Sequence, residues 1–174
     1  MRAVDLGMTG NESPDQIDAN KDLGELLEHI RARAGVLMGF APDPETLSSQ
    51  SKAVPKIAMV SSPQDIPLLD GNILPAADFD FGIRMISMGI CHKAVPLTGG
   101  MCASVAAAVA GGVVNDMLDA DVNLADRIRL GTPSGMIPFG ATVSNIDGNF
   151  VCEKVTVYRT ARRLMDGKVY VPDE

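Results

Sequence analysis

Hydrophobic and polar residues follow two different periods along this chain. Between residues 23 and 38 the apolar side chains recur every three or four positions, and charged residues occupy most positions between them. This spacing predicts an amphipathic helix. Asp18 or Asn20 can cap its start with a side-chain oxygen, and Gly39 can end it.

Shorter stretches have the composition or the two-residue period of strands. In residues 78–85 the apolar side chains face one side, whereas Asp78, Asp80 and Arg84 face the other. Further strands are predicted at residues 56–60, 127–130, 136–144, 150–158 and 168–171.

Turn and loop signals separate these elements. Asp-Gly pairs at residues 147–148 and 166–167 predict two hairpin turns. The polar segments 11–16 and 41–55 contain prolines, so we expect loops there.

A nearly apolar segment, residues 96–112, lies in the middle of the chain. From Met101 to Ala110 only Ser104 is polar, so the predicted helix lacks a polar stripe and should be buried on all sides. Thr98 is expected to cap its start and Gly111 to end it. The glycines before it would leave the first amides open as an anion site. The alternative is a core helix with a flexible start.

Together these elements predict an α+β fold in a single domain, residues 1–174. We expect a curled, mostly antiparallel sheet or barrel around one buried helix, with the amphipathic helix outside. The 46% hydrophobic content indicates a globular protein, and only 4% of residues are aromatic, which indicates an aliphatic core.

Net charge and cysteine content limit which partners this protein can bind and which cellular compartment it fits. A net charge of -7 argues against binding nucleic acid or an anionic membrane surface. No apolar run approaches the roughly 20 residues that cross a bilayer, and no signal-peptide core begins the sequence. Three widely spaced cysteines, Cys91, Cys102 and Cys152, fit a reduced, cytoplasmic protein.

The first candidate site lies where a strand leads into the apolar helix. Lys93 and His92 offer positive charge or a proton there, and a thiol such as Cys102 near a helix N-terminus can transfer protons. The alternative is a strand end with a solvated lysine and a hydrogen-bonded histidine, followed by a small buried cysteine.

Two other segments offer carboxylate-binding groups. In the turn at residues 131–135, Thr132 and Ser134 supply hydroxyls and amides of the kind that bind carboxylates, although plain turns share this composition. Arg159, Arg162 and Arg163 can bind carboxylates through paired hydrogen bonds, or form a solvated charged turn. Zinc-ligand spacing, a GxGxxG motif and a P-loop are all missing, so we expect no metal and no cofactor.

Several of these segments, taken in order, are similar to those of one protein family. They are residues 5–12, 87–99, 127–135 and 158–167, followed by the final predicted strand. Together they resemble the PrpF family, which includes 2-methylaconitate isomerases and 4-oxalomesaconate tautomerases. The resemblance covers nearly the whole chain.

The resemblance implies the diaminopimelate epimerase fold, in which two similar domains enclose an active site. It also implies that this sequence corresponds to the C-terminal half of the family's longer chains. The N-terminal domain, with a lysine implicated in proton transfer, would then be absent. By motif, Thr98, Gly99 and Gly100 would bind a substrate carboxylate, and Ser134 and Arg159 would face the same cleft.

The function implied is that of a cofactor-independent isomerase or tautomerase. Such an enzyme shifts an allylic proton, or isomerises a double bond, in an unsaturated tricarboxylate such as 4-oxalomesaconate or 2-methylaconitate. Helix-end amides and an arginine would stabilise the dienolate. Lys93, His92 and, more weakly, Cys102 are the candidates for acid–base catalysis.

Two alternatives stay open. The chain can be a non-catalytic carboxylate-binding or assembly module, because a lone half would expose apolar surface that invites association. A second copy would then stand in for the missing domain, giving a homodimer. It can also be a fragment, or the product of a split gene, without independent activity.

Overall fold

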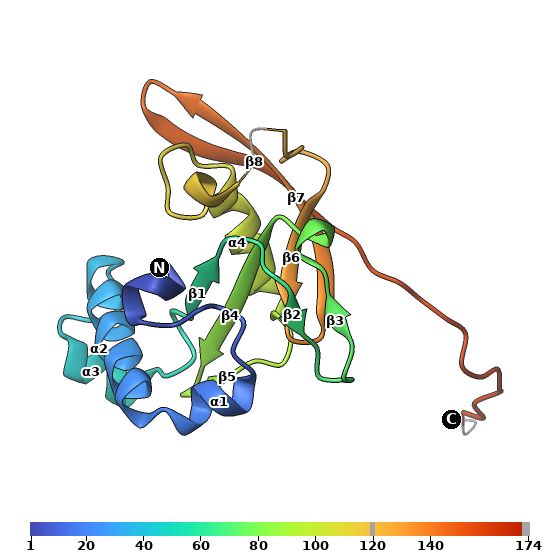
Figure 1. The fold of residues 1–174 in the computed structure, drawn as a ribbon, viewed down its shortest axis with the longest axis horizontal. Coiled ribbons are helices and arrows are strands. Elements are labelled where there is room, and N and C mark those ends of the chain that lie inside the picture. Colours follow the sequence, from blue (N-terminus) through green and yellow to red (C-terminus); the bar gives the residue numbers. More distant parts are fainter. Residues whose placement is uncertain (119–120, 172–174) are drawn as a thin grey trace.

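The structure is a computed structural model that describes residues 1–118 and 121–171 (Figure 1). The strands are β1 (Ile57–Ser61), β2 (Ile66–Pro67), β3 (Ile73–Leu74), β4 (Phe81–Ser87), β5 (Ile90–Cys91), β6 (Ile128–Thr132), β7 (Gly135–Ile146) and β8 (Asn149–Val157). The helices are α1 (Pro14–Ala19), α2 (Lys21–Leu37), α3 (Pro44–Gln50) and α4 (Leu97–Ala107), with short 3₁₀ helices η1 (Ala3–Leu6), η2 (Ala76–Asp78) and η3 (Asn115–Met117).

Six of the strands form one sheet, in the order β1-β4-β6-β7-β8, with β5 paired to the end of β4. Only the β4–β6 pair is parallel within this sheet. Strands β2 and β3 form a separate antiparallel pair. The predicted mostly antiparallel sheet is therefore confirmed, and each of the strands predicted at 56–60, 78–85, 127–130, 136–144 and 150–158 overlaps one of its strands. The strand predicted from Asp78 begins only at Phe81, because Ala76–Asp78 form the 3₁₀ helix η2.

The predicted amphipathic helix is α2. Asn20 caps it by accepting a hydrogen bond from the amide of Leu23 at 3.1 Å. Gly39, with a φ of 79°, follows its last turn. Both predicted boundaries are confirmed, because the signals that set them are local to the chain.

Helix α1 begins within the predicted loop at residues 11–16, and α3 lies within the one at residues 41–55, so both loop predictions are wrong where the chain is helical. Ser13 and Asp43 each accept a hydrogen bond from the backbone amide three residues further on. Pro14 and Pro44 then occupy the first helical position, where a proline lacks only an amide that would have no helical partner.

Helix α4 starts and ends earlier than predicted. Pro96 occupies the cap position and no side chain caps the helix, so Thr98 lies inside it. The helix ends with Ala108 at its C-cap, and Gly111, with a φ of 75°, belongs to the following turn. The predicted capping roles of Thr98 and Gly111 are therefore wrong.

The first turn of α4 contains two glycines because it lies very close to the sheet. A Cβ atom on Gly99 would overlap the side chain of Met85 on β4, and one on Gly100 would overlap Phe139 on β7. The missing side chains thus let the first turn pack directly against the sheet.

Only one side of α4 is buried. The residues on that side are Gly99, Gly100, Ala103, Ser104 and Ala107. On the opposite side Cys102 is exposed and Val105 is half-buried. The prediction of burial on all sides is wrong, because the curled sheet forms a half-barrel that covers only part of the helix circumference.

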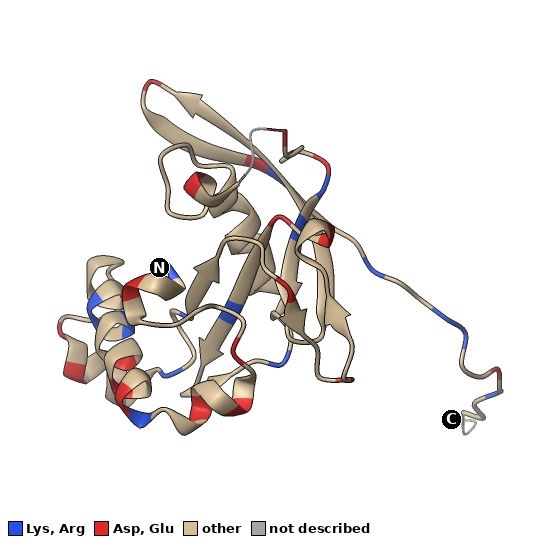
Figure 2. Cartoon of the chain, viewed as in Figure 1, with Lys and Arg blue, Asp and Glu red and all other residues tan. Residues whose placement is uncertain are grey.

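Strand β4 is the centre of the fold, and all seven of its residues are buried. Phe81, Ile83 and Met85 pack in one core cluster with α4, and Ile86 packs in a second cluster with α1 and α2. Arg84, the basic residue coloured blue in β4 in Figure 2, is only 1% exposed. The face of β4 that was predicted to be polar is covered by η1, α1 and α2, which together form the N-terminal layer.

The C-terminal part is much more open. The β7–β8 hairpin turns at Asp147 and Gly148, as predicted, and projects from the body (Figure 1). Residues 158–171 form neither helix nor strand and run away from the domain. The predicted last strand at 168–171 and its hairpin at 166–167 are wrong, because the described residues place no partner strand beside them.

No helix within the described ranges is long and apolar enough to cross a bilayer.

Candidate site at the start of helix α4

The segment between β5 and α4 carries His92 and Lys93 and is held by the backbone. The amide of His92 donates to the carbonyl of Met85 at 2.8 Å, and the amide of Cys91 donates to Oδ1 of Asp18 at 2.7 Å. Val95 then enters the core. The segment therefore leaves the sheet at a defined point and leads directly into the first turn of α4.

The structure brings Ser134 and Lys93 together. The Ser134 hydroxyl donates to the Lys93 carbonyl at 2.7 Å. The turn that carries Ser134 is itself fixed, because the Thr132 hydroxyl donates to the carbonyl of Gly135 at 2.8 Å and the Leu69 amide donates to that of Pro133 at 3.0 Å. Both Lys93 and Ser134 are exposed to solvent.

The first amides of α4, those of Leu97, Thr98 and Gly99, precede its first helical hydrogen bond, from the Gly100 amide to the Pro96 carbonyl at 2.9 Å. Thr98, Gly99 and Cys102 line a cavity of about 520 Å³. Its other walls are largely apolar and include Ile30, Ala34, Met38, Phe40, Val54 and Met85.

Two cations, Arg31 and Lys56, also line this cavity. Arg31 is buried and bonded by Nε and Nη2 to the carboxylate of Glu28 at 2.7 and 2.8 Å, which raises the pKa of Arg31. Among the described residues, Lys56 donates from Nζ only to the carbonyl of Ala53, at 3.0 Å. Lys56 is therefore the cation with spare donors for an anionic ligand.

The other predicted acid–base residues have different surroundings. Cys102 is the sixth residue of α4, beyond the first turn in which the helix dipole acts strongly. The Nε2 atom of His92 is buried and has no hydrogen-bond partner among the described residues. Beside it, burial raises the pKa of the Cys91 thiol to about 11.

Arg159 lines a different cavity, of about 710 Å³, together with Arg127, Tyr158 and Thr160. Tyr158 donates to the carbonyl and to Oδ1 of Asp126, at 2.8 and 2.9 Å, and the bond to the carboxylate raises the pKa of Tyr158. Within the described ranges, nothing joins Arg159 to Ser134 or to the start of α4. The structure therefore brings only part of the predicted set together.

Two residues near the site were not predicted from the sequence. Asp18 was considered only as a helix cap, and Arg84 only as part of a polar strand face. Nothing in their local sequence indicates contacts with residues 73 and 72 positions away in the chain. Over residues 1–118 and 121–171, no three His, Cys, Asp or Glu side chains cluster as metal ligands would.

Comparison with known proteins identifies close relatives. Residues 1–172 match the family model described as "PrpF protein". The chain is 40% identical to the 3-methylitaconate isomerase of Eubacterium barkeri, over 98% of this chain and 44% of that protein. It is 34% identical to the 2-methyl-aconitate isomerase of Shewanella oneidensis, over 99% of this chain and 43% of that protein. It is 28% identical to the (4E)-oxalomesaconate Delta-isomerase of Novosphingobium sp., over 98% of this chain and 42% of that protein.

Structural similarity agrees with these matches. The crystal structure of a methylitaconate-delta-isomerase aligns with a TM-score of 0.84 and 38% identity, over 96% of this chain and 42% of that one. This match confirms the α+β fold with a curled sheet. The chain spans less than half the length of the relatives that it matches.

Proposed function

The chain belongs to the PrpF family, and from that premise we propose that it forms the C-terminal half of an isomerase acting on an unsaturated polycarboxylate. The named relatives are all isomerases, and the compounds in their names share a carbon–carbon double bond and two or more carboxylates. The substrate class is then an unsaturated tricarboxylate, such as 2-methylaconitate or 4-oxalomesaconate, or a shorter dicarboxylate such as methylitaconate.

The observation that carries this proposal is the open first turn of α4. The amides of Leu97, Thr98 and Gly99 have no helical partners, and Thr98 and Gly99 line the cavity that also contains Lys56. Amides at a helix N-terminus and a nearby ammonium group favour a bound carboxylate. They also stabilise the charge that develops when a proton next to that carboxylate is removed.

The reaction proposed is a proton shift without a cofactor. A base removes an allylic proton, the double bond moves, and an acid returns a proton at the other end of the allyl unit. Lys93, His92 and Cys102 are the candidates in this half, with Ser134 and Arg159 as further carboxylate ligands. In the two-domain fold of this family the other half supplies the opposite wall of the cleft.

A matched pair of variants tests the role of the amides. Leu97→Pro removes one open amide, and the backbone tolerates it because Pro96 already has the extended ψ of 142° that a residue before proline prefers. Leu97→Ala keeps the amide. We expect Leu97→Pro to weaken carboxylate binding at least about tenfold, since a hydrogen bond to a charged group contributes about 1.5–3 kcal/mol.

The experiment is proton NMR of methylitaconate and of cis-aconitate in heavy water with the purified chain. Deuterium incorporation that is lost in Leu97→Pro, Arg159→Ala and Ser134→Ala, and retained in Leu97→Ala, supports the proposal. Line broadening without incorporation indicates a carboxylate-binding half-site. If neither effect occurs, the chain by itself has no such function.

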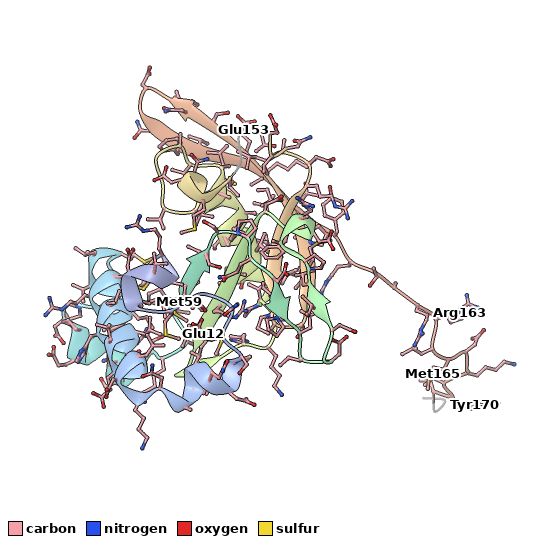
Figure 3. All side chains as sticks on the ribbon, in the orientation of Figure 1. Glu12, Met59, Glu153, Arg163, Met165 and Tyr170 are labelled. Atoms are coloured by element: carbon pink, nitrogen blue, oxygen red, sulfur yellow. The ribbon has the colours of Figure 1, made fainter. Side chains whose placement is uncertain are left out.

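The C-terminal segment favours a second candidate, an assembly module. Its apolar side chains are 81–91% exposed, and they are Leu164, Met165, Val169, Tyr170 and Val171. Figure 3 shows Met165 and Tyr170 far from the body of the domain. Burying such side chains is worth about 1.5–3 kcal/mol each, so a partner that covers them would bind favourably.

The partner proposed is either a domain equivalent to the unmatched part of the relatives or a second copy of this chain. Residues 158–171 carry four basic side chains and one acidic one, whereas the whole chain has a net charge of -7 (Figure 2). The segment is therefore opposite in charge to the chain as a whole. Sedimentation of the chain, with and without residues 159–174, distinguishes the cases. A dimer that dissociates on truncation indicates the second copy, and a monomer in both forms leaves only the heterologous domain.

A further inference from the structure

Strand β5 is an edge strand, and no described strand lies on its outer side. It contains only Ile90 and Cys91, and β4 is its single strand partner. A carboxylate takes the place of the missing strand, since Oδ1 of Asp18 accepts the Cys91 amide at 2.7 Å. A hydrogen bond to an ionised acceptor is stronger than the ladder bond that it replaces.

Asp18 is held in position by the short helix α1. Ser13 and Gln16 form a reciprocal capping box at its start, with bonds of 3.2 and 2.8 Å, and Ile17 packs in the core cluster that contains Cys91. These contacts fix the direction in which the Asp18 carboxylate leaves the last turn of α1.

The segment before α1 is attached to the adjacent strand. Nε of the buried Arg84 donates to the carbonyl of Glu12 at 2.8 Å. The segment from Glu12 to Asp18 is thus bonded to β4 at one end and to β5 at the other.

On its other side, the candidate acid–base segment is held by Ser134. The Lys93 carbonyl accepts the Ser134 hydroxyl, only two residues after the peptide that Asp18 binds. His92 and Lys93 therefore lie between two side-chain hydrogen bonds that come from opposite parts of the chain.

We propose that Asp18 is a positioning residue, which fixes the β5 peptide and thereby places His92 and Lys93 at the start of α4. This inference rests on the proposed function, because it assigns Asp18 to the acid–base segment of that site. Asp18 acts through the backbone and needs no contact with substrate. An asparagine can supply the same acceptor oxygen, whereas an alanine cannot.

The first test measures amide hydrogen exchange by NMR and does not depend on activity. In Asp18→Ala we expect the Cys91 amide to exchange at least about tenfold faster, as the loss of one hydrogen bond implies. Asp18→Asn should stay within about threefold of the wild type. Asp15→Ala is the matched control, since Asp15 is exposed on the same helix and has no side-chain hydrogen bond among the described residues.

The second test measures deuterium incorporation into substrate. We expect Asp18→Ala to lower kcat about tenfold or more with little change in KM, and Asp18→Asn to restore it. If Asp18 had a merely structural role, Asp18→Ala would lower the urea midpoint without a selective fall in kcat at unchanged KM. If Asp18→Ala unfolds, Asp18→Glu, whose longer side chain moves the carboxylate away from the Cys91 amide, is expected to give the same fall in kcat.

Two results would overturn the inference: an unchanged Cys91 amide in Asp18→Ala, or an Asp18→Asn variant as impaired as Asp18→Ala. Failure of the proposed function looks different. A wild-type chain that neither binds nor deuterates a carboxylate removes that function, while the amide exchange rates still decide whether Asp18 fixes β5.

Discussion

Strands β4 and β8 are both predicted from the sequence, but they lie in opposite environments. Every residue of β4 is buried, whereas the first six residues of β8 are exposed and only the last three are half-buried. Strand β4 lies between α4 and the N-terminal layer, while β8 is the outer strand of a projecting hairpin (Figure 1). The local sequence therefore predicts the strand, and the neighbouring layers decide its burial.

Charged residues on the two strands differ in the same way. On β4, Arg84 bonds the carbonyls of Glu12 and Ile83, its Nη2 has no partner among the described residues, and burial lowers the pKa of Arg84. On β8, Glu153 and Lys154 are exposed to solvent. A charged side chain on β4 therefore needs hydrogen-bond acceptors from the surrounding protein, whereas a charged side chain on β8 is hydrated by solvent.

The largest expected difference between the strands is in core truncation. Phe81→Ala on β4 should lower the free energy of unfolding by about 3–5 kcal/mol, because a fully buried phenylalanine leaves a cavity. Phe150→Ala on β8 is the matched control, and at 43% exposure it should lower it by less than about 1 kcal/mol. Urea unfolding of both variants measures the difference, and equal losses would mean that β8 is covered in solution.

A second prediction concerns the close contact of β4 with β1. A Cβ on Gly82 would lie 2.5 Å from the hydroxyl oxygen of Ser61, so Gly82→Ala should cost about 1–3 kcal/mol. Ser61→Ala removes that oxygen, which is buried without a partner in the described part of the chain. The double variant should recover most of the loss in urea unfolding, and additive losses would show that the backbone itself is strained.

The next prediction uses the cysteines to compare the same regions. The thiol of Cys91, next to β4, is buried and its pKa is raised to about 11, whereas Cys102 and Cys152 are exposed. At pH 8 a maleimide should label two thiols per folded chain and a third only after unfolding, as counted by mass spectrometry. Labelling of all three in the folded chain would show that β5 opens readily.

The same raised pKa gives a direction for the effect of pH. The folded state holds the Cys91 proton more tightly than the unfolded state, so its contribution to stability is complete below pH 9 and declines as the pH rises toward 11. Urea unfolding of wild type and Cys91→Ala across this range isolates the effect. The wild type should lose more stability than the variant, and parallel curves would refute the assignment.

The smallest effect is expected in the C-terminal segment. Val169→Lys should change the free energy of unfolding by less than about 0.5 kcal/mol, because the side chain is 91% exposed and touches no core cluster. Differential scanning calorimetry checks this result. A larger loss that depends on protein concentration would show that the segment is buried between chains.

Local signals predicted the elements that depend on neighbouring residues. The cap at Asn20, the stop at Gly39 and the turn at residues 147–148 all occur as expected. The helices α1 and α3 were missed although Ser13-Pro14 and Asp43-Pro44 are local signals, because the prolines indicated loops. Of the predicted site residues, Ser134 lies beside Lys93, and Thr98 and Gly99 line one cavity, while the chemical roles of all of them stay predictions.

The sequence by itself determined the class of the fold, most of the strands and the apolar character of α4, because periodicity and turn chemistry act over a few residues. Only the tertiary structure decided the bounds of α4, the burial of Arg84 and the bond from the Cys91 amide to Asp18. It also decided that no described strand pairs with residues 168–171. Each of these depends on which distant segments meet, and a strand without a neighbour cannot satisfy its backbone in a sheet.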